Sequence, residues 1–173
     1  MYELKPISRE AIPRALERAE RYRLLNEPYE AESICRDILR TEPGNQRALV
    51  THLLALTDQF GRRPEAGVTG AREVLAALSD PYERSYYGGV ICERWGKAQL
   101  RRSGPGATAL GWLKEAMALF EEAMGNSPAG NEDAVLRWNA CARLLNRETR
   151  GAANPPGGGE SPHPLSDDEM PMR

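Results

Sequence analysis

The residue types that catalyse reactions or bind metals are few in this chain and stand far apart. Its three cysteines (Cys35, Cys92 and Cys141) form no CxxC pair, and its two histidines, His52 and His163, lie in different halves of the sequence. A zinc site needs several such ligands close together, and a catalytic thiol needs a histidine partner in an electropositive setting. The sequence therefore predicts no metal site, no cofactor and no catalytic residue, and we expect a protein that is not an enzyme. The cysteines are expected to be small buried core residues.

Positively charged side chains, by contrast, recur at helical spacing in two segments. Arg94, Lys97 and Arg101 are spaced i, i+3, i+7 within an expected helix, so they share one face. Arg143 and Arg147 stand four residues apart in a later expected helix. Such faces are either ordinary solvated helix surface or a binding surface for an acidic peptide or a carboxyl terminus.

Composition disfavours several classes of function. The chain has 173 residues and a formal net charge of −2, with 23 Lys and Arg against 25 Asp and Glu, so no overall basic field indicates a nucleic-acid partner. No run of about 18 apolar residues is present, so we expect no membrane-spanning helix. The N-terminal stretch MYELKPISRE lacks the apolar core of a secretory signal, and unpaired cysteines are typical of a reducing compartment. We therefore expect a cytoplasmic protein.

Helix formers and helix breakers divide the chain into two regions. Residues 1–150 are predicted to form one all-α domain, and residues 151–173, rich in Gly and Pro and net acidic, a disordered tail. Asn45, Asp80 and Asn131 are predicted to cap helices. The stretch 61–67 is expected to be a loop because it contains glycines and a proline. About seven helices are expected, at residues 9–25, 28–40, 46–60, 69–79, 81–102, 108–124 and 132–147.

Small and large residues recur in these helices at a spacing known from one protein family. The second-helix pattern of tetratricopeptide repeats (TPR) is matched in full by Ala116, Phe120, Ala123 and Pro128. In the first unit, Ala19, Tyr22, Ala31 and Pro43 fall at matching positions of the family's helix pair, while Cys35 and Ile38 replace the usual aromatic residue and Ala. The pair Trp95-Gly96 is similar to the large-then-small step of a first helix. The last helix, with Trp138, Cys141, Ala142 and Leu145, is similar to a lone capping helix. Over about residues 10–147 the chain resembles a divergent TPR protein.

The resemblance implies both a fold and a function. The fold would be three antiparallel helix pairs and a capping helix, wound into a right-handed superhelix. The function would be non-enzymatic binding of a protein or peptide in the concave groove of the first helices, as an adaptor, scaffold or chaperone. Together with the basic faces, this predicts an acidic partner. The candidate binding residues are Arg47, Val50, Leu54, Arg94, Lys97, Arg101, Asn139, Arg143 and Arg147.

Two further hypotheses stay open at this point. In the first, the chain is a self-associating structural subunit of a larger assembly, with Trp95, Trp112 and Trp138 as partly exposed anchors. In the second, the acidic tail folds back onto the basic groove as an internal competitor, because its charge is opposite and it is tethered nearby.

Overall fold

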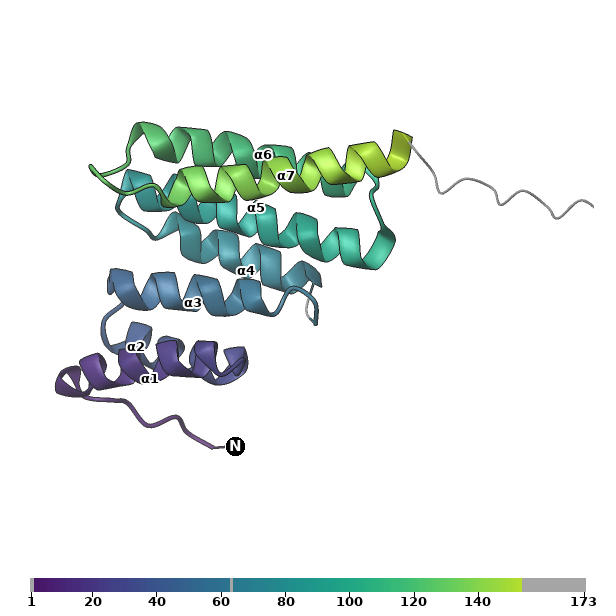
Figure 1. Cartoon of the computed structure of the whole chain (residues 1–173). Coiled ribbons are helices and arrows are strands. Elements are labelled where there is room, and N and C mark those ends of the chain that lie inside the picture. Colours follow the sequence, from purple (N-terminus) through teal and green to yellow (C-terminus); the bar gives the residue numbers. More distant parts are fainter. Residues whose placement is uncertain (1, 63, 154–173) are drawn as a thin grey trace, which may run out of the picture.

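The computed structural model describes residues 2–62 and 64–153, which form helices joined by short turns and contain no strand. Each helix packs against the next one along the chain, so neighbours in sequence are neighbours in space (Figure 1). The expected all-α architecture with about seven helices is confirmed. Within the described residues, no helix is long and apolar enough to cross a bilayer. After a 3-10 turn at Arg9–Ala11, the helices are α1 (Ile12–Leu24), α2 (Pro28–Thr41), α3 (Gln46–Asp58), α4 (Pro64–Ala76), α5 (Pro81–Ser103), α6 (Ala107–Gly125) and α7 (Asp133–Ala153).

All three predicted side-chain caps are present. The Asn45 Oδ1 atom accepts a hydrogen bond from the Ala48 amide at 2.9 Å. The Asp80 carboxylate accepts a hydrogen bond from the backbone N–H of Tyr82 at 3.0 Å. The Asn131 side-chain oxygen accepts one from the backbone N–H of Asp133, also at 3.0 Å. Because the first amides of a helix have no partner within it, these caps fix where α3, α5 and α7 begin.

Two expected boundaries are wrong. Helix α4 begins at Pro64 and not near residue 69, so the expected loop 61–67 is shorter. Proline suits the first position of a helix, where its missing N–H costs nothing, and Gly67 lies inside the helix against the Phe60 ring. Helix α7 continues to Ala153 and not only to about residue 147, which carries it past the expected domain end at 150. The prediction of a disordered tail otherwise falls on 154–173, outside the described residues.

The core runs without interruption from α1 to α7. Buried side chains form a first cluster with Ile12, a middle cluster with Leu53 and a last cluster with Leu113. The partly buried Leu39 packs against the first and middle clusters. Leu54 and Tyr87 pack against the middle and last clusters. The Phe60 and Trp95 rings meet edge to face in the middle cluster, with centroids 5.7 Å apart. No helix pair buries its apolar surface alone, so neighbouring pairs stabilise one another.

The closest packing lies between α5 and α6. A Cβ atom added to Gly89 would stand 2.5 Å from the Phe120 ring, and one added to Gly96 would stand 3.1 Å from Leu113. Gly89 and Gly96 therefore lie where α5 and α6 touch. Ala116 and Ala123 on α6 are likewise fully buried.

Candidate functional site

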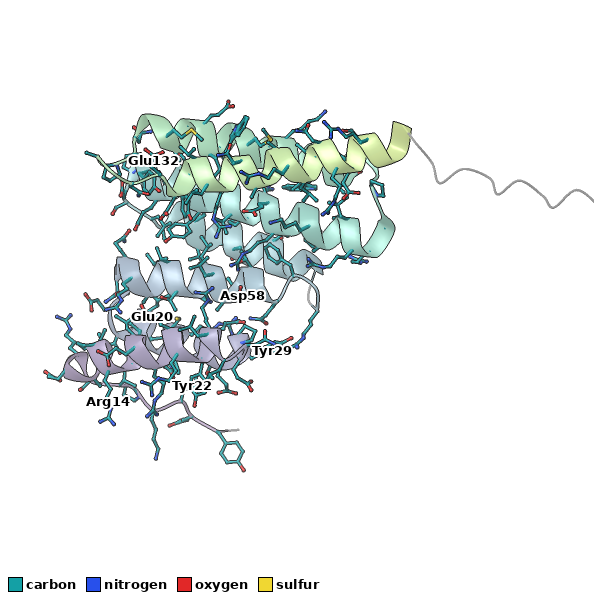
Figure 2. The ribbon with its side chains drawn as sticks, in the orientation of Figure 1. Arg14, Glu20, Tyr22, Tyr29, Asp58 and Glu132 are labelled. Atoms are coloured by element: carbon teal, nitrogen blue, oxygen red, sulfur yellow. The ribbon has the colours of Figure 1, made fainter. Side chains whose placement is uncertain are left out.

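Charged side chains connect α1, α3 and α5 across the array. The Arg47 guanidinium on α3 donates two hydrogen bonds to the Glu20 carboxylate on α1, both at 2.8 Å. At the other end of α3, the Asp58 carboxylate accepts from Arg23 of α1 at 2.9 Å and also pairs with Arg94 of α5. Figure 2 labels Glu20 and Asp58 in the space where α1 and α3 face each other. Asp58 thus holds three helices together.

A buried carboxylate makes the corresponding link between α5 and α7. The Glu93 side chain is only 4% exposed and pairs with Lys97 on its own helix and with Arg137 on α7, the latter at 2.7 Å. Arg137 also donates from Nε to the Tyr86 hydroxyl at 2.9 Å. A buried carboxylate without such partners would destabilise the fold strongly, so the two cations are part of the packing.

These contacts settle where several candidate binding residues lie. Arg47, Arg94 and Lys97 each pair with a carboxylate of the chain itself, so their charge is compensated. Arg94 is also the most enclosed of the three: burial of its guanidinium lowers its pKa, and its Nη1 donates to Thr57 Oγ1 at 2.6 Å. Arg47 and Arg94 therefore link one helix to another, whereas Lys97 compensates the buried Glu93 on its own helix.

The candidate residues without charge lie mostly in the packed interior. Val50 and Leu54 are half-buried and pack against the hydrophobic core. The Leu54 carbonyl also accepts a hydrogen bond from Arg94 at 3.4 Å. Asn139 is half-buried on α7. The apolar contribution expected for a groove is therefore used largely inside the domain.

The remaining candidate cations gather toward the carboxyl ends of α5 and α7, which lie on the same side of the molecule (Figure 1). Arg101 lines a hollow of about 200 Å³ together with Arg94, Lys97 and the Asp58 carboxylate that pairs with Arg94. Arg143, Arg147 and Arg150 line a second hollow, of about 380 Å³, with Asn146. We call the set Arg101, Arg143, Arg147 and Arg150 the basic end.

The arginines of the basic end differ from those at the centre of the array. Over 2–62 and 64–153, no carboxylate pairs with Arg101 or Arg143, and Arg147 pairs only with the adjacent Glu148. Helix carboxyl termini carry partial negative charge, which favours arginines there for helix stability alone. The same guanidinium groups nevertheless keep donors available for an outside carboxylate.

The acidic partners of these cations were not predicted from the sequence. Glu93 and Lys97 are spaced i, i+4, a signal visible in the sequence. The pairing of Asp58 with Arg23 and Arg94 crosses three helices and has no local signal. Partner carboxylates of this kind become visible only once the helix order in space is known.

The cysteines behave as expected for core residues. All three are buried, and burial raises the pKa of the Cys35 and Cys92 thiols to about 12 and that of Cys141 to about 11. The thiolate, which is the reactive form, is therefore scarce at neutral pH. In the part of the chain that the structure describes, no three His, Cys, Asp or Glu side chains gather as metal ligands.

The tryptophans are engaged with the chain itself. Trp95 is only 7% exposed and lies in the core. Trp112 is half-buried beneath the Arg72 guanidinium, 5.0 Å from the ring centroid, and the Trp138 Nε1 atom donates to Glu121 at 2.9 Å. The rings therefore have intramolecular contacts that account for their presence.

Comparison with known proteins adds no identity. No protein-family model matches the chain, and neither a curated protein nor a solved structure matches it. Function must accordingly be inferred from the chain's own geometry, and the TPR resemblance stands on residue spacing.

Proposed function

We propose that the protein is a TPR-like, non-enzymatic interaction module that binds an acidic segment of a partner protein at its basic end. The observation that carries this proposal is the division of the cations. Arg47, Arg94 and Lys97 are paired with carboxylates of the chain, whereas Arg101 and Arg143 line hollows and have no carboxylate partner within the described residues. Guanidinium groups held on helices bind carboxylates with defined geometry and little reorganisation.

The chemistry of the basic end supports binding and not catalysis. Arginine stays protonated at physiological pH, so it attracts and orients anions but transfers no proton. An acidic peptide can place several carboxylates along the two helices. Each exposed pair contributes about 0.2–1 kcal/mol. Three such pairs would strengthen binding by roughly 0.6–3 kcal/mol, which is a factor of about 3 to 150.

The proposal is tested by measuring the affinity of the full chain for a labelled octaglutamate peptide by fluorescence anisotropy. The variant R101E/R143E/R147E should bind about 10-fold more weakly or worse, and wild-type binding should weaken as salt is added. Arg40→Glu is the matched control, because Arg40 is an exposed arginine in the last turn of α2. It should bind within about two-fold of wild type. Equal binding by the triple variant, or an equal loss in Arg40→Glu, would overturn the proposal.

A further inference from the structure

A third hollow lies between α2, α3 and α4, and none of the arginines of the basic end lines it. Its volume is about 220 Å³. Gly67 and Gly70 of α4 leave its wall open, and Leu56 and Val74 make part of it apolar. The polar side chains that line it are Glu32, Arg36, His52, Gln59 and Glu73.

His52 is the unexplained feature of this cavity. The residue is only 9% exposed, and neither ring nitrogen has a hydrogen-bond partner anywhere in 2–62 and 64–153. A buried polar atom without a partner costs about 1–3 kcal/mol, so native proteins rarely leave one unpaired. An occupant of the cavity that reaches the imidazole would supply the missing hydrogen bonds.

The Glu32 carboxylate is held in place beside it. Glu32 is 5% exposed and Gln59 is 2% exposed. The Glu32 carboxylate accepts a hydrogen bond from Gln59 Nε2 at 2.7 Å and forms an ion pair with the Arg36 guanidinium at 2.5 Å. Gln59 is anchored in turn by a bond from Nε2 to the Ala55 carbonyl at 3.1 Å. Each carboxylate oxygen has a second lone pair, so Glu32 can accept further hydrogen bonds.

The charge around the cavity favours a cation. Burial lowers the pKa of His52, which keeps its imidazole neutral and one ring nitrogen free to accept a hydrogen bond. Glu32 and Glu73 contribute two negative charges against the single positive charge of Arg36, whose side chain is 64% exposed. An occupant with several N–H donors and a positive charge satisfies both His52 and Glu32.

We propose that this cavity binds the protonated head group of a primary alkylamine. The ammonium group carries three N–H donors on one point charge, which the Glu32 carboxylate and the His52 imidazole can accept. The methylene stem would lie along Leu56 and Val74, as alkyl stems of lysines do on apolar surface. The cavity is large enough for such a group, since it equals the space of roughly seven liquid waters. This inference does not depend on the basic end.

The two histidines make a direct assay possible. In the full chain, two-dimensional NMR of the imidazole Cε1–H groups gives one signal for His52 and one for His163. Titration with n-butylammonium should move the His52 signal to saturation, with a dissociation constant on the order of millimolar, while the His163 signal stays in place. Tetramethylammonium carries the same charge but no N–H donor, so it should leave His52 unmoved.

Two variants separate specific binding from general effects. Glu32→Gln keeps the size of the side chain and removes its charge, and should weaken n-butylammonium binding about 10-fold or more. Arg40→Glu, at an exposed position on the same helix outside the cavity lining, should bind within about two-fold of wild type. If Glu32→Gln does not fold, the n-butylammonium and tetramethylammonium titrations of the wild-type chain still decide.

Each outcome has a defined meaning. No movement of the His52 signal with n-butylammonium would overturn the proposal and leave water as the occupant. An equal shift with tetramethylammonium, or unchanged affinity in Glu32→Gln, would also overturn it, because the donors would not matter. Given binding, a parallel titration with Nα-acetyl-lysine amide identifies the source. Binding of both compounds fits a lysine of a partner chain, and binding of n-butylammonium alone fits a free amine.

Discussion

The contact between Gly89 of α5 and Phe120 of α6 gives the sharpest test of the packing. A Cβ atom at Gly89 would stand 2.5, 2.7 and 3.0 Å from three atoms of the Phe120 ring, closer than real Cβ atoms approach other atoms. Phe120 is fully buried and its ring also lies 5.9 Å from the Tyr86 ring, so it has little room to turn away. Gly89→Ala therefore forces α5 and α6 apart or strains the ring.

Two opposing effects set the size of the change. Alanine in a helix interior is favoured over glycine by about 0.5–1 kcal/mol. Overpacking a well-filled core costs about 1–3 kcal/mol. The packing cost outweighs the helix gain, so Gly89→Ala should lower the free energy of unfolding by roughly 0.5–2 kcal/mol. For a chain of this size that lowers Tm by about 1–8 °C.

Gly111→Ala is the matched control, because Gly111 also lies inside a helix, α6, but has no atom within 4 Å of its added Cβ. It should gain only the helix term and raise Tm by about 1–4 °C. Thermal unfolding followed by circular dichroism measures both variants. Opposite signs are expected. A stabilised Gly89→Ala would refute the close approach of α5 and α6, and with it the packing role of the small residues.

Three further predictions concern buried groups. Glu93→Gln removes the charge that its two cationic partners share, and should lower the free energy of unfolding in urea by about 1–3 kcal/mol; an unchanged midpoint would contradict the buried pairing. Burial lowers the pKa of His52 below the ordinary 6.5. The positive charge of Arg36 lowers this pKa further, and the negative charge of Glu32 offsets part of the shift. The imidazole therefore binds a proton more readily in the unfolded chain than in the folded one. The contribution of neutral His52 to the free energy of unfolding is fully present above about pH 6.5 and is lost as the pH drops through that value. Urea unfolding of His52→Gln should lack this fall between pH 7 and 6, and an identical profile would count against it. Finally, a thiol reagent at pH 8 should leave the native chain unlabelled over the minutes in which it labels every cysteine in urea, because burial raises all three thiol pKa values. Rapid native labelling would show an exposed thiol.

Local signals in the sequence were enough for most of the fold. Each cap at Asn45, Asp80 and Asn131 is a contact within three residues, so its geometry follows from the local chain. The start of α4 was missed because Pro64 was treated as a breaker, although proline is favoured at a first helical position. No strong terminating residue stands at the expected end of α7 near residue 147, and the helix continues to Ala153.

The candidate site was less accessible to such reasoning. Helical spacing placed Arg94, Lys97 and Arg101 on one face but carried no information about what faces them. The partner of Arg94 is Asp58, on another helix, and the partner of Lys97 is a buried glutamate on its own helix. Electrostatic pairing between helices depends on their relative position, which is set by the whole core. The distinction between structural and available cations therefore required the structure.

Binding of an acidic segment at the basic end can be mapped by NMR on the full chain. Backbone amide signals are recorded while octaglutamate is added at low salt. The largest shifts are expected in residues 97–103 and 139–150, and they should be lost in R101E/R143E/R147E. Shifts that spread evenly over the surface, or that centre on α1 and α2, would contradict binding at the basic end.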